Sequence, residues 1–298
     1  MTEHRLGIIM NGVTGRMGTN QHLIRSILEF MKDGGIKLDN GDTVMPDPIL
    51  VGRSAEKIEA LAKKHGVGRW TTDLDGAIAN RGDTLFFDSA STNLRAELLR
   101  KAIDAGKDIY CEKPSASTLH DAIEVYQRAE KAGVRHGVVQ DKIFLPGLQK
   151  MKTLMDEGFF GRLLSVKIDF GYWVFEGDWR QSQRPSWNYR KEDGGGIILD
   201  MMPHWRYVLD NTFGGVKSIS CLGRVNIDKR WDENAKPYDS DADDASYALV
   251  ELEGGAVAQI FASWCTRVRK DDLVTFHADG TQGAAVAGLT KCYTQDRA

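Results

Sequence analysis

The stretch Leu6-Gly7-Ile8-Ile9-Met10-Asn11-Gly12-Val13-Thr14-Gly15-Arg16-Met17-Gly18 decides the fold of this protein. Its first five residues form a short continuous apolar run, which is typical of a parallel strand covered on both faces. Asn11-Gly12 ends the run in a turn. A helical pattern follows, with apolar residues on one face at Leu23, Ile24, Ile27, Leu28 and Met31. Strand, glycine turn and helix together predict the first unit of a doubly wound sheet.

The first half of the chain repeats this alternation. Further strands are predicted at residues 48–51, 84–87, 108–111 and 134–139, with helices at 55–65, 95–105 and 119–132. Alternating strands and helices with short links imply parallel strands and right-handed crossovers. The glycine- and aspartate-rich stretch between Met31 and Asp47 predicts a surface insertion carrying a turn or small hairpin.

The second half of the chain has a different pattern of predicted secondary structure. Longer β-like runs with few helices occur at residues 163–173, 216–225, 245–252, 256–264 and 273–278. Strands that follow a βαβ region predict an α+β domain built on a largely antiparallel sheet. We therefore expect an α/β protein with a Rossmann-like domain at residues 1–140 and an α+β domain at residues 141–298.

Composition narrows the range of partners. The 298 residues include 39 Lys and Arg and 42 Asp and Glu, which gives a net charge of −3. This composition lacks the excess of positive charge that binding to nucleic acid or an anionic membrane needs. A small-molecule partner is therefore expected. The apolar run at the start is too short for a secretion signal, which predicts a cytoplasmic protein. Neither a zinc cage nor a disulfide framework is indicated by the widely spaced Cys111, Cys221, Cys265 and Cys292.

The glycine turn predicts a dinucleotide site. Gly12, Gly15 and Gly18 form G-x-x-G-x-x-G, in which small residues let backbone N–H groups and a helix N-terminus approach a pyrophosphate. Thr14 replaces the second glycine of the better-known G-x-G-x-x-G pattern. We expect Arg16 and Met17 to contact the cofactor as well. A plain tight turn is the alternative, but the position between a strand and a helix favours the cofactor.

The end of the second strand bears on the choice between NAD and NADP. A carboxylate there would hold the ribose 2′-hydroxyl of NAD, whereas this chain has Gly52-Arg53-Ser54. The cation of Arg53 and the hydroxyl of Ser54, with Arg16 as a second positive charge, favour NADP over NAD. The alternative is that both arginines are only solvated surface groups.

Two further motifs bring a resemblance to a known family. Glu112-Lys113-Pro114 ends a predicted strand, and Gly194-Gly195-Gly196 precedes Asp200 and His204. With the glycine turn, in this order, they resemble the Gfo/Idh/MocA family of glucose-fructose oxidoreductase and inositol dehydrogenase. The resemblance implies an NAD(P)-dependent oxidoreductase that transfers a hydride between nicotinamide and a hydroxyl or keto carbon of a sugar, sugar derivative or polyol such as a cyclitol. It also implies catalytic roles for Lys113, Asp200 and His204, and a homodimer or homotetramer.

The resemblance extends to further cofactor contacts, with departures. Where the family has Ala-Thr-Pro-Asn followed by His, this chain has Ser89-Ala90-Ser91-Thr92 followed by Arg95. Contacts through backbone and hydroxyl groups are therefore expected at Ser89, Ser91 and Thr92, together with contacts from Glu112, Lys113 and Gln140. Because family members usually continue past the position of Ala298, the resemblance also implies that the second domain is incomplete.

The three candidate catalytic residues suit alcohol oxidation. This reaction needs a base for the hydroxyl proton and a group that stabilises the developing alkoxide. We assign His204 as the base, Asp200, four residues earlier on one helix face, as the group that orients it, and Lys113 as the hydroxyl-binding cation. The roles of Lys113 and His204 are open to exchange. No third ligand accompanies the Asp/His pair at a sensible spacing, so no metal is expected.

Substrate contacts are expected from the aromatic stretch between Phe170 and Arg190. Flat rings cover the apolar face of a pyranose or cyclitol, and Trp187 and Tyr189, close before the glycine turn, are the first candidates. Trp173, Val174, Phe175, Trp179 and Arg184 belong to the same stretch. Lys142, with Lys113 and His204, completes the expected substrate site. Sheet core and subunit contact are the alternative roles for these rings.

Two other functions fit the same scaffold. By resemblance, some relatives hydrolyse glycosides through transient oxidation by bound NAD, which a test for sugar release without net nicotinamide change would detect. A non-catalytic NADP-binding regulatory protein is the third possibility. Its mark would be loss of the lysine or histidine, and Lys113 and His204 are both present.

Overall fold

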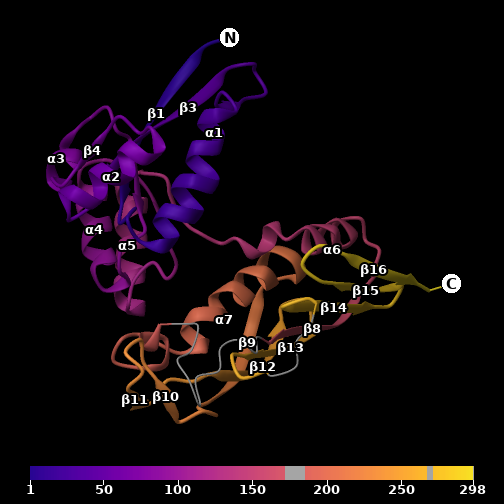
Figure 1. Ribbon diagram of the computed structural model, residues 1–298. Helices are drawn as coiled ribbons and strands as arrows, with labels where there is room; N and C mark the ends of the chain where they lie inside the picture. Colours follow the sequence, from indigo (N-terminus) through magenta and orange to yellow (C-terminus); the bar gives the residue numbers. More distant parts are fainter. Residues whose placement is uncertain (172–184, 267–270, 298) are drawn as a thin grey trace. The chain divides into compact units, whose positions relative to one another are not determined.

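The computed structural model describes residues 1–171, 185–266 and 271–297 (Figure 1). These residues divide into two compact units, unit 1 at Met1–Val139 and unit 2 at Gln140–Ala298. Each unit has a sheet of its own and an apolar core of its own. The predicted combination of a Rossmann-like, mostly parallel sheet and a largely antiparallel sheet is confirmed.

Unit 1 is a doubly wound sheet with strand order β2-β3-β1-β5-β6-β7, to which β4 adds beside β3. The strands are β1 (Glu3–Asn11), β2 (Ile36–Lys37), β3 (Thr43–Val51), β4 (Trp70–Thr71), β5 (Leu85–Asp88), β6 (Asp108–Cys111) and β7 (His136–Val138). The helices are the π-helical η1 (Gly18–Ile27), α1 (Leu28–Lys32), α2 (Ala55–His65), α3 (Leu74–Ala79), α4 (Thr92–Asp104) and α5 (Leu119–Ala132). Since β1, β3, β5, β6 and β7 are parallel, their carboxyl ends lie along one edge of the sheet.

The sheet of unit 1 is buried on both faces, as the continuous apolar run of β1 predicts. Ile9 belongs to the core beneath α4 and α5, while its neighbours Ile8 and Met10 belong to the core beneath η1 and α2. Successive side chains of a strand point to opposite faces, so a strand between two helical layers needs apolar residues at every position.

The second strand is longer than predicted. β3 begins at Thr43 rather than at Pro48, and the antiparallel β2–β3 pair is the small hairpin expected in the insertion. Pro46 and Pro48 concealed this strand, because proline cannot donate a ladder hydrogen bond. Both fall in the gap on one side of β3, between the residues paired with β2 and those paired with β4, where no backbone partner is required.

Unit 2 consists of a seven-stranded sheet in the order β16-β15-β14-β8-β13-β12-β9, packed against helices, with a separate β10–β11 hairpin. The strands are β8 (Leu163–Gly171), β9 (Val216–Arg224), β10 (Lys229–Trp231), β11 (Pro237–Asp239), β12 (Ala245–Leu252), β13 (Val257–Ser263), β14 (Val274–Gly280), β15 (Gly283–Ala287) and β16 (Cys292–Asp296). The helical segments are η2 (Lys142–Phe144), α6 (Pro146–Asp156), η4 (Ser186–Tyr189), α7 (Ile197–Val208) and η5 (Leu209–Phe213). The pairing of β8 with β13 is parallel and the other pairings are antiparallel.

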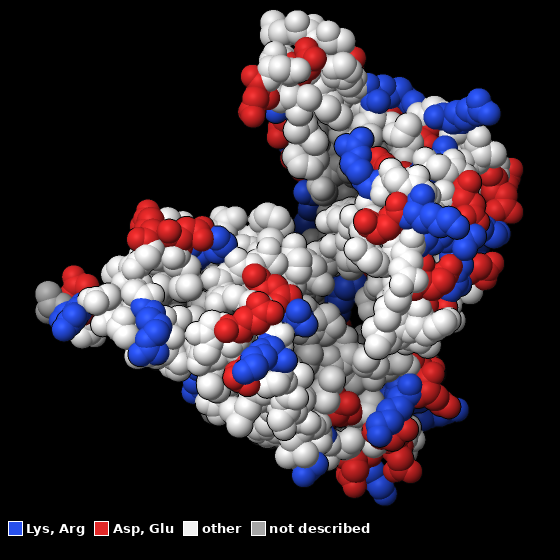
Figure 2. Space-filling model, turned by 180° about the vertical axis from the view of Figure 1, so that it is seen from behind, with Lys and Arg blue, Asp and Glu red and all other residues white. Residues whose placement is uncertain are grey.

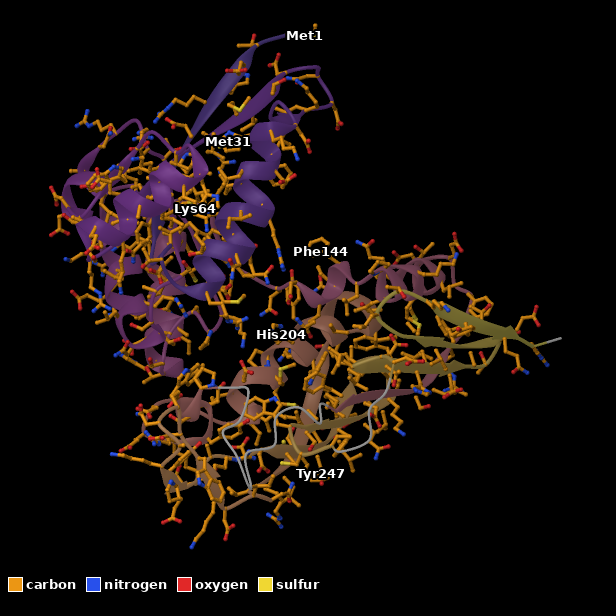
Figure 3. The ribbon with its side chains drawn as sticks, in the orientation of Figure 1. Met1, Met31, Lys64, Phe144, His204 and Tyr247 are labelled. Carbon is orange, nitrogen blue, oxygen red and sulfur yellow. The ribbon has the colours of Figure 1, made fainter. Side chains whose placement is uncertain are left out.

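The two faces of this sheet differ. Helix α7 packs on one face through Trp205, which is fully buried against Phe170 and Phe276. Tyr247 lies on the other face, and Figure 3 shows it and His204 of α7 on opposite sides of the sheet. That other face is open: Tyr247, Leu249 and Val257 are all about half exposed.

Charged side chains of both signs are interspersed on the face of the molecule seen in Figure 2. This mixture agrees with the nearly balanced composition and contrasts with the continuous basic surface that nucleic-acid binding needs. No helix within residues 1–171, 185–266 and 271–297 has both the length and the apolar character needed to cross a bilayer.

Candidate active site

The glycine turn after β1 is shaped by close contact with the loop after β5. Gly12 has φ +73°, and a Cβ on it would lie 2.5 Å from the backbone nitrogen of Ala90. A Cβ on Gly18 would lie 2.6 Å from the hydroxyl of Ser89. The four residues between Gly12 and Gly18 that are exposed are Thr14, Gly15, Arg16 and Met17. The turn therefore has the tight backbone and open surface that fit a dinucleotide, with Thr14 to Gly18 as the residues that would hold its pyrophosphate.

The end of β3 lies beside this turn. A Cβ on Gly52 would come within 3.6 Å of the Thr14 methyl group. Arg53 is exposed, and the hydroxyl of Ser54 accepts a hydrogen bond from the Lys57 N–H at 3.4 Å, which caps α2. The structure thus brings Arg53 and Ser54 to the edge that carries the glycine turn.

The loop after β5 is held by a buried arginine. Arg95 is 2% exposed and its Nε donates to the fully buried Asp88 carboxylate at 2.9 Å. Its guanidinium also donates to the Ala90 carbonyl at 2.6 Å and to the Thr92 hydroxyl at 3.3 Å. Arg95, at the family's histidine position, is therefore a structural support. The Ser89 hydroxyl donates to the Asn11 carbonyl at 3.0 Å, which ties the loop to β1.

The Glu112-Lys113-Pro114 motif follows β6, and the Lys113–Pro114 peptide is cis. Glu112 is nearly buried, and its Oε1 lies 2.5 Å from Nε2 of His22 on η1. The other carboxylate oxygen accepts the Lys113 N–H at 3.2 Å. Burial raises the pKa of Glu112, but His22, the Lys113 N–H and the charge of Arg95 together outweigh it, and the net pKa is lowered. Glu112 is thus held as an anion beside the candidate catalytic lysine.

In unit 2, a glycine turn leads into α7. Gly196 has φ +119°, and Asp243 caps the helix by accepting the N–H of Ile197 on its carbonyl and the N–H of Ile198 on its carboxylate, both at 2.8 Å. Asp200 lies in the first turn of α7 and His204 one turn later, which places them on one side of the helix, as the spacing predicts.

The imidazole of His204 is held by residues just after β7. Its Nδ1 lies 3.1 Å from Oε1 of Gln140 and 3.8 Å from a carboxylate oxygen of Asp141. The side chain of His204 is 9% exposed. Gln140, predicted as a cofactor contact, is thus within hydrogen-bond distance of the candidate base. Asp141 belongs to the stretch Gln140-Asp141-Lys142, which the resemblance places among the polar residues near the substrate.

Lys142, a predicted substrate contact, lies 2.9 Å from both carboxylate oxygens of Asp141. Burial raises the pKa of Asp141, but the nearby Lys142 and His204 lower it by more. The net shift of this pKa is therefore downward. Gln140, Asp141, Lys142 and His204 therefore form one polar cluster in unit 2.

The two aromatic candidates have different surroundings. Trp187 is 48% exposed, which leaves its ring surface open to a ligand. Tyr189 is fully buried, with the Arg230 guanidinium 3.8 Å from its ring centre and Trp264 packed edge-on. This is a core position. Trp173, Val174, Phe175, Trp179 and Arg184 lie outside the described residues.

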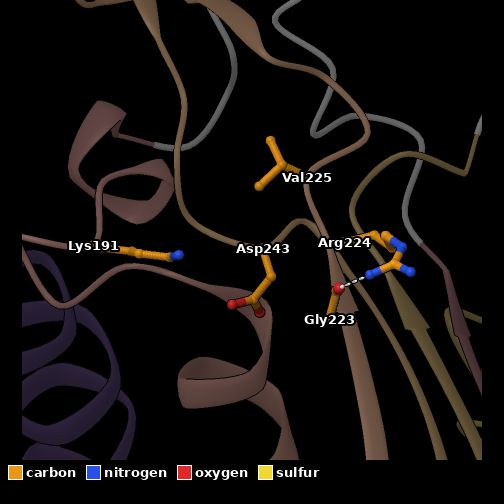
Figure 4. Close-up of a pocket in the computed structure, with 5 residues that line it drawn as sticks. All are labelled: Lys191, Gly223, Arg224, Val225 and Asp243. Carbon is orange, nitrogen blue, oxygen red and sulfur yellow. Dashed lines mark hydrogen bonds between the residues drawn. The ribbon is translucent and has the colours of Figure 1, made fainter.

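A hollow of about 240 Å³ lies elsewhere in unit 2 (Figure 4). It is lined by Lys191, Gly223, Arg224, Val225 and Asp243, next to the capped N-terminus of α7. The sequence indicated no role for these five residues, and His204 lies about two turns further along the same helix.

The fold and these motifs define a class of protein: a two-unit oxidoreductase with a Rossmann-type nucleotide-binding half. Residues 48–140 match the NAD-binding Rossmann fold of the Gfo/Idh/MocA oxidoreductases, and residues 148–286 match the C-terminal domain of the same family. The chain belongs to the Gfo/Idh/MocA family, which confirms the predicted membership and the predicted NAD(P)-dependent oxidoreductase.

Individual relatives agree. The chain is 54% identical over 295 residues to D-xylose dehydrogenase of Paenarthrobacter nicotinovorans, covering 98% of this chain and 76% of that protein. It is 26% identical to levoglucosan dehydrogenase of Pseudarthrobacter phenanthrenivorans, covering 80% of this chain and 64% of that protein. Among solved structures, an NAD binding oxidoreductase from Klebsiella pneumoniae has the same fold, with a TM-score of 0.83 at 23% identity over 99% of this chain and 76% of that one.

Proposed function

We propose that this protein oxidises D-xylose or a closely related aldose with NADP⁺ or NAD⁺ as hydride acceptor. The observation that carries this proposal is the 54% identity, over 98% of the chain, to a D-xylose dehydrogenase. We also propose a cytoplasmic location, in agreement with the four free cysteines. The bound nicotinamide supplies the hydride-accepting carbon, and the side chains of this chain supply proton transfer and binding.

In this proposal His204 accepts the hydroxyl proton. Gln140 Oε1 and the Asp141 carboxylate both lie near Nδ1, and both are hydrogen-bond acceptors, so they favour the tautomer with its proton on Nδ1. That tautomer has its basic lone pair on Nε2. Lys113 binds the same substrate hydroxyl and stabilises the developing alkoxide, and Asp200 supports the imidazole from the preceding turn of α7. Whether Lys113 and His204 exchange these roles is tested by the pH dependence of kcat/KM, measured in a variant of each of the two residues.

The substrate test uses purified protein, both nicotinamides and a panel of D-xylose, other aldoses, sugar acids and cyclitols. We expect reduction of the cofactor with D-xylose, and a kcat reduced about 10²- to 10³-fold in Lys113→Met. A circular dichroism spectrum of Lys113→Met that matches wild type shows that the fold is intact. Turnover of a cyclitol but no aldose would refute the substrate proposal, and full activity of Lys113→Met would refute the role of the lysine.

For the cofactor, we propose a preference for NADP. The exposed Arg53 at the end of β3, with exposed Arg16 in the glycine turn, supports it. Arg53→Ala should raise KM for NADP about ten- to hundredfold and leave KM for NAD nearly unchanged. Lys64→Ala, an exposed cation at the far end of α2, is the control. An equal change for both cofactors would contradict the preference.

We further propose a homodimer or homotetramer built on the open face of the unit 2 sheet. On this face Tyr247 pairs with Leu222 and Phe261, next to Leu249, which is 59% exposed. Exposed apolar side chains in adjacent rows are typical of subunit interfaces. Light scattering of wild type and Leu249→Asp tests this: we expect the variant to dissociate, and a monomeric wild type would refute the proposal.

A further inference from the structure

The backbone around Lys113 is held on both sides by buried charged groups. On one side, Glu112 accepts the Lys113 N–H at 3.2 Å. On the other, the carbonyl of Pro114 accepts a hydrogen bond from the Arg95 guanidinium at 2.5 Å. Arg95 is itself fixed by Asp88, so this second contact rests on a fully buried ion pair. The position of Lys113 therefore depends on what holds Glu112.

Glu112 is held by His22. Nε2 of His22 and Oε1 of Glu112 are 2.5 Å apart, with side-chain exposures of 16% and 11%. The imidazole of His22 also packs on the ring of Phe87, a residue of β5, with 4.6 Å between the two ring centres. This contact restricts the orientation of the imidazole from a second side. Low exposure makes this contact stronger than a solvated ion pair, because little water competes with it.

His22 belongs to η1, which begins at Gly18 of the glycine turn. The same helix therefore borders the proposed pyrophosphate site and reaches the strand end that bears Lys113. η1 is wound more loosely than an α-helix: the Leu28 N–H bonds to the Leu23 carbonyl, five residues back. Such π-helical winding is rare and is found often at functional sites.

We propose that His22 is a positioning residue, which acts through Glu112 to fix Lys113 relative to the glycine turn. This inference rests on the proposed role of Lys113. The effect of His22 in this proposal is to keep the Glu112 carboxylate on the Lys113 N–H. Displacement of a catalytic group by about 1 Å can cost on the order of 10²-fold in rate. Loss of His22 should therefore lower turnover more than binding.

The test is a double-mutant cycle on the full chain with His22→Leu, Glu112→Gln and the double variant. We expect each single variant to lower kcat about ten- to hundredfold, and we expect His22→Leu to change the Kd for the reduced nicotinamide less than threefold. Because His22 acts through Glu112, the double variant should be no slower than the slower single variant. His22→Gln, whose amide nitrogen can still donate to Glu112, should recover most of the rate.

The matched control is His136→Gln, which alters another His–Glu pair of unit 1. His136 contacts Glu130 at 2.7 Å, but Glu130 is 58% exposed and the pair lies outside the proposed site. We expect wild-type kcat from it. The inference is overturned if His22→Leu keeps wild-type kcat, if the losses of the two single variants add in the double variant, or if His22→Gln is as slow as His22→Leu. Full activity of Lys113→Met would instead overturn the proposed function, so the two failures are distinguishable.

Discussion

Unit 1 and unit 2 hold their candidate catalytic side chains by different means. Lys113 in unit 1 follows a short strand and is held by charged groups, with Glu112 on one side and Arg95 on the other. His204 in unit 2 lies on a helix whose neighbouring Trp205 is fully buried in an aromatic core, and the neutral side chain of Gln140 lies within hydrogen-bond distance of its imidazole.

This difference has energetic consequences. A buried ion pair is sensitive to the loss of either member, because the remaining charge has no compensation. Apolar packing distributes its stabilisation over many small contacts, so a polar group at its border can be removed without loss of the fold. We therefore expect loss of a member of the buried ion pair beside Lys113 to lower stability, and loss of a polar group beside His204 to lower activity alone.

The largest effect should come from Arg95→Met. This change leaves the fully buried Asp88 without its guanidinium partner and releases the Pro114 carbonyl. We expect the free energy of unfolding to fall by about 3–5 kcal/mol. Urea unfolding, followed by circular dichroism, measures this change.

The control for this variant is Arg100→Met on the same helix. Arg100 contacts Asp121 and Glu124, and all three side chains are about one-third exposed. Its loss should cost at most about 1 kcal/mol. Equal losses from the two variants would remove the distinction between buried and exposed pairs in unit 1.

In unit 2, Gln140→Leu should lower kcat about tenfold, because it removes the nearer of the two acceptors that favour the Nδ1–H tautomer of His204. The melting temperature should stay within a few degrees of wild type, because α7 is held mainly by its core contacts. Steady-state kinetics and calorimetry on one preparation measure both. Gln140→Glu, which retains an acceptor, should keep more of the rate than the leucine variant; the reverse order would contradict the tautomer assignment.

The smallest effect concerns acid stability in unit 1. Asp83 is fully buried and bonded to Arg69 and Arg5; burial raises its pKa, but these bonds lower it below the ordinary 3.8. Since the folded pKa is depressed, the stabilisation is complete above the unfolded pKa and is lost as pH falls through the folded value. Asp83→Asn should therefore lose about 1–2 kcal/mol at neutral pH.

The difference between Asp83→Asn and wild type should shrink as the pH falls below 3.8, the ordinary carboxyl pKa. Urea midpoints measured across that range provide the comparison. A difference that is constant with pH would show that the charge of Asp83 is not what stabilises this region.

Much of the fold could be read from local sequence. The helices predicted at residues 55–65 and 119–132 and the strand at 108–111 have the observed boundaries, because apolar periodicity and Gly66 and Gly133 after the helices mark them directly. The predicted start of β3 at Pro48 was wrong, and the strand begins at Thr43. Pro46 and Pro48 argue against a strand unless it is known that neither β2 nor β4 pairs with β3 at these positions.

The sequence by itself determined the two kinds of sheet, the glycine turn, the Glu112-Lys113-Pro114 motif and the family, since these rest on short local patterns and on their order along the chain. Only the tertiary structure decided what surrounds these motifs. His22 and Glu112 are 90 residues apart in the chain, Gln140 and His204 are 64 apart, and Tyr189 becomes a core residue only through contacts with Arg230 and Trp264. Such contacts depend on strand order and helix packing, which no local pattern of residue types encodes.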